Sequence, residues 1–191
     1  MRTVAALAVL LACSGNLSAQ SMHPNTREGF WIGFGGGSGS AGLDCSTCAT
    51  DRIGAFSGYL RMGGTVSQTL LLGGEANGWF HSQSGVTEDI AYVAFVALWY
   101  PIRTGALYLK AGIGGMSYRG DDGIDTLTAN APAGSLGIGY EFRVGRKFSV
   151  VPYLNSLASS SVTLKLDGQP ISSGESIKIT LVQVGVGLTW H

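Results

Sequence analysis

The chain has 191 residues, of which only 13% are charged, and its formal net charge at pH 7 is zero. This length suits one domain, and the sparse, balanced charge excludes the basic surface of a nucleic-acid-binding protein. Thirty glycines occur together with a positive mean hydropathy, a combination that is rare in soluble globular domains because glycine weakens both helices and strands.

The first residues, MRTVAALAVLLACSGNLSAQ, have the pattern of an export signal. An early arginine is followed by an apolar run too short to span a membrane as a helix, and small residues then form a cleavage site. We therefore expect residues 1–19 to be a signal peptide that is cut between Ala19 and Gln20, and 20–27 to be a short N-terminal segment. The sequence VLLAC is an alternative signal, a lipoprotein box with Cys13 as the lipidated residue.

Apolar alternation then identifies strands. The longest apolar run after the signal is IAYVAFVALWY, which is about half a transmembrane helix but matches a membrane-crossing strand of roughly 9–11 residues. Elsewhere, apolar residues alternate with polar or small ones, which predicts strands with one apolar face. Pro152 removes a ladder donor inside one of them, as at an edge or a bulge. In chain order the predicted strands are 30–37, 53–62, 69–80, 89–100, 106–118, 133–142, 148–160 and 178–191.

The connections between these strands alternate in length. Long ones cover 38–51, 81–88, 119–132 and 162–176, and short ones cover 63–68, 101–105 and 143–147. This pattern, together with an even strand count and the lack of an amphipathic helix to cover a sheet, is typical of outer-membrane barrels. The sequence therefore predicts an all-β fold, an eight-stranded antiparallel up-and-down transmembrane β-barrel over 28–191, with short periplasmic turns and longer extracellular loops.

The two faces of the strands differ in chemistry. Apolar faces such as Val182, Val184, Val186 and Leu188 would contact lipid, while the charged residues would lie inside, because a cation at the lipid midplane costs roughly 2–4 kcal/mol. Inside so narrow a barrel the charges must be paired. We expect an ion network in which Lys110 pairs with Glu75 and Glu141, with Arg61 nearer the periplasmic rim. Inward glycines would make room for Trp31, Tyr59, Trp79 and Tyr108, so that the interior is filled.

Aromatic and basic residues gather near the strand ends. We expect an interfacial aromatic girdle and basic short turns that meet anionic lipid headgroups. The aromatic set is Trp79, Tyr92, Trp99, Tyr100, Tyr118 and Trp190, and the basic set is Arg103, Arg143, Arg146 and Lys147.

The first long loop contains Cys45-Ser46-Thr47-Cys48. Zinc would need two further ligands, and none is nearby, so a small disulfide between Cys45 and Cys48 is the favoured interpretation in an exported protein. The acidic sequence DDGID attracts divalent cations in principle, but its spacing matches no complete calcium loop. We expect no metal and no cofactor.

Catalysis would require a nucleophile and a base, and His81-Ser82 is the one pair at an outer strand end. Adjacent strand residues point to opposite faces, so these two cannot readily bond to each other. We therefore expect no enzyme. A lipid-modifying enzyme or narrow channel on the same barrel is the alternative, and a soluble ligand-binding barrel with its apolar face inside is a weaker one.

Several segments resemble the bacterial outer-membrane β-barrel domain family, with its small opacity-type and attachment-type proteins: GFWIGFGGGSGS, GYLRMGGTVSQTLLLGGEANGW, LYLKAGIGGMSY, SLGIGYEFRVGRKFSVVPYLN and LVQVGVGLTWH. The resemblance implies residence in the outer membrane, contact with its lipid, and insertion by the barrel-assembly machinery. It also implies a terminal-strand assembly signal and surface loops that bind an unknown ligand. We therefore expect a non-enzymatic structural or surface-exposed protein whose loops mediate adhesion or binding. The signal residues are Val182, Val184, Val186, Leu188 and Trp190, the last followed by His191 where the family usually ends in Phe.

Overall fold

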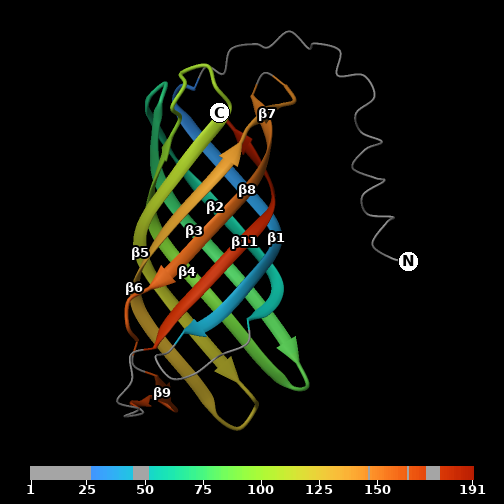
Figure 1. The fold of residues 1–191 in the computed structure, drawn as a ribbon, viewed down its shortest axis with the longest axis vertical. Coiled ribbons are helices and arrows are strands. Elements are labelled where there is room, and N and C mark those ends of the chain that lie inside the picture. Colours follow the sequence, from blue (N-terminus) through green and yellow to red (C-terminus); the bar gives the residue numbers. More distant parts are fainter. Residues whose placement is uncertain (1–26, 45–51, 146, 163, 171–176) are drawn as a thin grey trace, which may run out of the picture.

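The computed structural model describes residues 27–44, 52–145, 147–162, 164–170 and 177–191. Within these ranges eight long antiparallel strands form a barrel (Figure 1). No helix in the described ranges is long and apolar enough to cross a membrane. The long strands are β1 (Phe30–Asp44), β2 (Ile53–Ser67), β3 (Leu70–Gln83), β4 (Val86–Trp99), β5 (Leu107–Asp121), β6 (Thr126–Tyr140), β8 (Phe148–Ser159) and β11 (Lys178–Trp190); the short ones are β7 (Phe142–Arg143), β9 (Lys165–Leu166) and β10 (Gln169–Pro170).

The barrel is closed by pairing of the first and last strands. Each long strand pairs with its neighbours in the sequence, and β1 pairs with β11 over thirteen residue pairs, from Ile32–Trp190 to Asp44–Lys178. The C-terminus and the first described residues lie at the end that carries β7, called here the turn end; the opposite end, with β9, is the loop end (Figure 1). The predicted eight-stranded up-and-down barrel is confirmed.

Two of the predicted long loops are largely strand. The β3–β4 hairpin turns only at Ser84 and Gly85, both with positive φ as a tight hairpin turn requires, and β5 and β6 are joined by residues 122–125 alone. The predicted loops over 81–88 and 119–132 are therefore wrong. The strands continue there with polar residues, such as the cross-strand pair His81–Glu88, and apolar alternation could not detect them.

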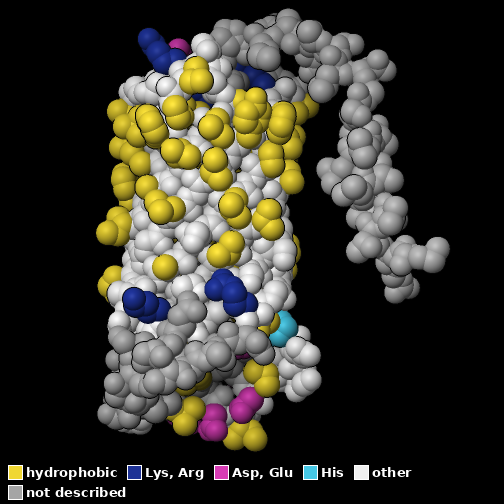
Figure 2. Space-filling model, in the orientation of Figure 1, with side chains coloured by type: hydrophobic (Ala, Val, Ile, Leu, Met, Phe, Trp, Pro, Cys, Tyr) yellow, Lys and Arg dark blue, Asp and Glu magenta, His cyan; other side chains and the backbone are white. Residues whose placement is uncertain are grey.

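The outer face of the barrel is apolar over much of its height. Val184, Val186 and Leu136 are exposed by 59%, 56% and 68%, whereas Glu75 and Lys110 are buried at 3% and 2%. Figure 2 shows hydrophobic side chains on the wall, dense toward the turn end and sparser toward the loop end. A soluble barrel would need the reverse arrangement, so that alternative is wrong. This exterior matches hydrocarbon, in which a sheet satisfies its own backbone only if it is closed.

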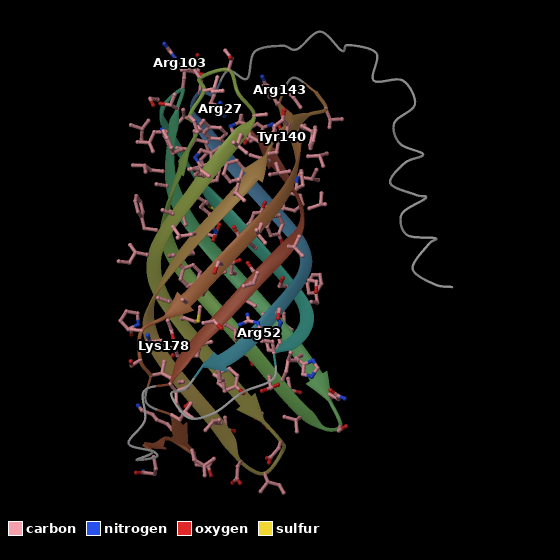
Figure 3. All side chains as sticks on the ribbon, viewed as in Figure 1. Arg27, Arg52, Arg103, Tyr140, Arg143 and Lys178 are labelled. Carbon is pink, nitrogen blue, oxygen red and sulfur yellow. The ribbon has the colours of Figure 1, made fainter. Side chains whose placement is uncertain are left out.

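Basic residues flank the apolar wall. Arg103 and Arg143 lie at the turn end, and Arg52 and Lys178 lie toward the loop end (Figure 3). Arg52 is held on the outer face by hydrogen bonds from Nη2 to the Ser40 carbonyl oxygen (2.6 Å) and from Nη1 to Thr180 Oγ1 (3.0 Å). Such cations suit the headgroup level of a membrane.

The aromatic girdle is only partly as expected. Trp99 is 50% exposed on the outer face, and Trp190 lies with its ring centroid 5.5 Å from Lys147 Nζ. The predicted girdle is wrong for four residues, which are buried because the alternation of their strands turns them into the lumen: Trp79, Tyr92, Tyr100 and Tyr118. Four aromatic residues not included in the prediction are exposed near the turn end: Phe30, Tyr140, Phe142 and Phe148.

One seam of the wall is short, the ladder between β6 and β8. It has seven residue pairs, from Ala133–Ser159 to Gly139–Tyr153, against eleven to fifteen in the other ladders between long strands. A proline limits it at each end. Pro132 accepts a hydrogen bond from the Ser160 N–H (2.8 Å) but returns none, and pairing stops at Pro152 and resumes in the same register at Phe142–Val150. Pro152 therefore marks neither an outer edge nor a bulge, but an interruption of a ladder.

Candidate functional site

The lumen is filled by large side chains packed over inward glycines. Trp31, Tyr59 and Tyr108 are all at most 5% exposed. Tyr59 packs edge-on to Tyr153 with ring centroids 4.8 Å apart, and a Cβ on Gly35 would lie 2.6 Å from Tyr59 Cε1. Gly35, which has no Cβ, therefore leaves the space that the Tyr59 ring occupies. At this level the lumen is occupied by these buried rings.

An ion network lies at mid-height in the lumen. The Lys110 ammonium donates to Glu75 Oε1, and the same oxygen accepts a hydrogen bond from Asn77 Nδ2 at 2.7 Å. Arg61 faces Glu75 across the β2–β3 ladder but donates from Nη2 to Tyr108 Oη at 2.8 Å. Its guanidinium also lies over the Tyr59 and Tyr108 rings. Aromatic faces and a charged hydrogen bond are the compensation that a buried guanidinium needs.

Glu141 lies apart from this network, so the expected Lys110–Glu141 pair is wrong. Lys110 is opposite Gly137 in the β5–β6 ladder, and Glu141 is four residues further along, beyond the end of β5. At about 3.3 Å per residue this separation exceeds the reach of a direct contact. Glu141 instead belongs to a second cluster that closes the turn end.

The turn-end cluster has three partners around Glu141. Tyr100 Oη donates to Oε1 at 2.6 Å, Arg27 Nη2 to Oε2 at 3.2 Å, and His191 Nε2 lies 3.3 Å from Oε1. Arg27 also donates to the Gly105 carbonyl oxygen (2.7 Å) and lies 3.4 Å above the Tyr100 ring. Sequence reasoning missed Arg27 because it precedes the first apolar alternation, and it treated His191 only as a departure at the chain end.

Asp121 and Asp122 cap the turn between β5 and β6. Asp122 Oδ1 accepts the N–H groups of Ile124 (2.9 Å) and Asp125 (2.8 Å), and Asp121 Oδ1 accepts that of Gly123 (2.9 Å). These backbone N–H groups lower the pKa of the Asp122 carboxyl. No group of three or more metal-ligating side chains occurs in the ranges that the structure covers. Because these carboxylate oxygens already accept hydrogen bonds from the turn backbone, they are not arranged to coordinate a cation.

The proposed catalytic pair is split across the wall. His81 points inward and stacks on Trp79 with ring centroids 5.9 Å apart, while Ser82 is exposed on the outer face, 3.5 Å from Thr87 Oγ1. The alternation of β3 separates them, as expected of neighbours on one strand. The two side chains cannot act together on one substrate.

Of the remaining predicted sites, some lie outside the described residues and one, the terminal strand, is described. Cys45 and Cys48, the Ala19–Gln20 cleavage site and Cys13 lie outside the described residues. The terminal-strand residues are described, and Val182, Val184, Val186 and Leu188 all face outward, by 39–59% of their surface. Trp190 is half-buried between Ile32 and Phe148 in the ladders of β1 and β8.

Comparison with known proteins gives a fold but no sequence relative. No protein-family model matches the chain, and no curated protein is significantly similar to it. Among solved structures, Neisserial surface protein A is similar over 87% of this chain and 99% of its own, with 12% identity and a TM-score of 0.55. The attachment invasion locus protein of Yersinia pestis is similar over 85% of this chain and 99% of its own, with 12% identity and a TM-score of 0.53.

These likenesses agree with the geometry of the chain itself. The closed antiparallel barrel, the apolar exterior and the ion pairs inside are one consistent arrangement. The chain has the fold of the small eight-stranded outer-membrane β-barrels.

Proposed function

We propose that the protein is a non-enzymatic, structural and surface-exposed barrel of the outer membrane whose loop end contacts partners outside the cell. The observation that carries this proposal is the filled lumen. At the level of Arg61, Glu75 and Lys110 the interior is occupied by paired, buried side chains, and the turn end is closed by Glu141 with its partners. With these levels filled, contacts with partners would occur outside the filled part of the lumen.

The loop end supports a role in contact with partners. The β3–β4 and β5–β6 hairpins continue as polar ribbons past the apolar wall, ending in tight turns at Ser84–Gly85 and at residues 122–125. Such ribbons present side chains on a rigid scaffold. A structure of the Yersinia pestis attachment invasion locus protein in complex with the heparin analogue sucrose octasulfate, at 14% identity and a TM-score of 0.51, supports adhesion as the kind of role this barrel can have.

The experiment that tests the location and the closed lumen uses the full-length protein expressed in a bacterium. We expect an outer-membrane fraction, a gel mobility that changes on boiling, and no stepwise conductance in planar bilayers. A periplasmic, heat-indifferent protein would contradict the barrel in the membrane. Stepwise conductance would contradict the filled lumen and favour the narrow channel.

The lipid-modifying alternative makes a separate prediction. His81→Ala and Ser82→Ala would each change the lipid profile of the envelope if these side chains formed a catalytic pair. We expect unchanged lipid profiles for both, because His81 stacks inside on Trp79 while Ser82 faces outward.

A further inference from the structure

The lumen changes character between the ion network and the loop end. Instead of polar residues, its wall there is aliphatic, with the buried side chains of Ala41, Ile90 and Ile179 and the half-buried Ile53. These residues come from β1, β4, β11 and β2, so that the wall is apolar around the barrel rather than on one strand. They enclose a cavity of about 70 Å³. The barrel is closed by the pairing of β1 with β11, so its closure does not depend on this cavity.

An aromatic pair and one carboxylate complete the cavity. Trp79 and Tyr118 line it, and so does Glu88. The Trp79 indole is fixed by a hydrogen bond from Nε1 to the Gly39 carbonyl oxygen (3.0 Å) and by His81 stacked on it. Tyr118 Oη donates to Glu88 Oε1 at 2.6 Å, which orients the carboxylate. Among the described residues no cation pairs with Glu88.

This combination selects a particular ligand chemistry. Aliphatic walls favour an apolar body, while indole and phenol faces beside a carboxylate favour a cation, above all an ammonium group. A neutral apolar molecule would leave the carboxylate without a counter-charge next to an apolar surface, which is unfavourable. The volume of about 70 Å³ restricts the body to a short alkyl chain, since a cavity that binds a benzene ring measures about 150 Å³.

We propose that the loop end of the lumen, defined by Ala41, Ile90, Ile179, Trp79, Tyr118 and Glu88, is a binding site for a small apolar molecule that carries a protonated amine. The aliphatic residues hold the apolar body, Trp79 and Tyr118 flank the ammonium, and Glu88 accepts its hydrogen bonds. The site lies on the loop-end side of the ion network, so a ligand would reach it without crossing the filled part of the barrel.

Binding of three probes to the folded protein in lipid nanodiscs tests this site: propylammonium, 1-propanol and methylammonium, each measured by calorimetry against empty nanodiscs. Propylammonium should bind at least about tenfold more tightly than either other probe, because only it offers both the alkyl chain and the charge. Glu88→Gln should remove this advantage and leave 1-propanol unchanged. Ala41→Leu, which fills the cavity, should weaken both three-carbon probes.

Two matched variants control for general effects. Glu28→Gln removes an exposed carboxylate, and Ala158→Leu enlarges a side chain on the outer face; both should bind propylammonium like the unmodified protein. Heat-dependent gel mobility shows that each variant is folded. The proposal is overturned if propylammonium does not bind, if Glu88→Gln keeps its preference for the amine, or if Ala158→Leu weakens binding as much as Ala41→Leu.

Discussion

The contribution of a charged residue to the stability of this barrel depends on how deeply its ion pair is buried. Lys110 and Glu75 have no exposed side-chain surface, whereas Arg119 and Asp121 form a pair with 57% and 35% exposure. Removing one member of a buried pair leaves the other charged and unpaired, which is far more costly than losing an exposed pair. The position of a charge therefore decides its contribution to stability more than its having a partner.

Lys110→Met should destabilise the folded barrel by about 3–5 kcal/mol, because Glu75 then stays buried without its ammonium. The free energy of unfolding in urea, measured with vesicle-reconstituted protein, checks this. Arg119→Met is the matched control and should cost less than about 1 kcal/mol, since its partner Asp121 is exposed to water. Equal losses for the two variants would contradict a buried, compensated pair at Lys110.

Gly35→Ala should destabilise the barrel by about 1–3 kcal/mol, because the added Cβ meets the Tyr59 ring at 2.6 Å and Tyr153 prevents that ring from moving away. Gly64→Ala on the outer face is the control, since a Cβ there has no neighbour within 4 Å. The same unfolding measurement applies. A Gly35→Ala variant as stable as Gly64→Ala would show that the lumen is looser than described.

At the scale of elements, the strands are held by ladders of unequal length. The β6–β8 seam is limited by Pro132 at one end and by Pro152 at the other. Pro132 has no N–H to donate to Ser160, and the Ser160 carbonyl oxygen instead accepts a hydrogen bond from Ser159 Oγ at 2.8 Å. A ladder with few consecutive bonds opens with a smaller free energy than a long one. The seam is therefore where the wall should open first.

Backbone amides of β6 and β8 that face the seam should exchange with deuterium faster than those of the β1–β11 ladder, measured by NMR in bilayers. The alternation of the ladder places the nitrogen of Pro152 opposite Tyr140, so Pro152→Ala restores a donor and should slow exchange at Leu154 and Ile138. Pro101→Ala, in the β4–β5 connection, is the control and should leave the seam unchanged. Seam exchange unaffected by Pro152→Ala would contradict this account.

Strand existence and the inward or outward direction of side chains could be predicted from the sequence, because apolar alternation records which medium each face meets. Val184 facing out and Glu75 facing in are examples. Where both faces of a ribbon are polar, as at His81–Glu88, the alternation carries no signal and strand ends were missed. Partners within the lumen depend on register, which sequence alone did not supply, so Glu141 was paired with Lys110 instead of Arg27.

At the scale of the whole molecule, the medium around the barrel decides which substitutions it tolerates. Val184 lies midway along β11, between Lys178 and Trp190, and is 59% exposed on the outer face. Val184→Arg should cost about 2–4 kcal/mol, because its charge would enter hydrocarbon, whereas Ser82→Arg at the polar loop end should cost about 0–1 kcal/mol. Unfolding titrations of the two variants in vesicles compare them directly. Similar small losses at both positions would mean that water, and not lipid, contacts the wall at Val184.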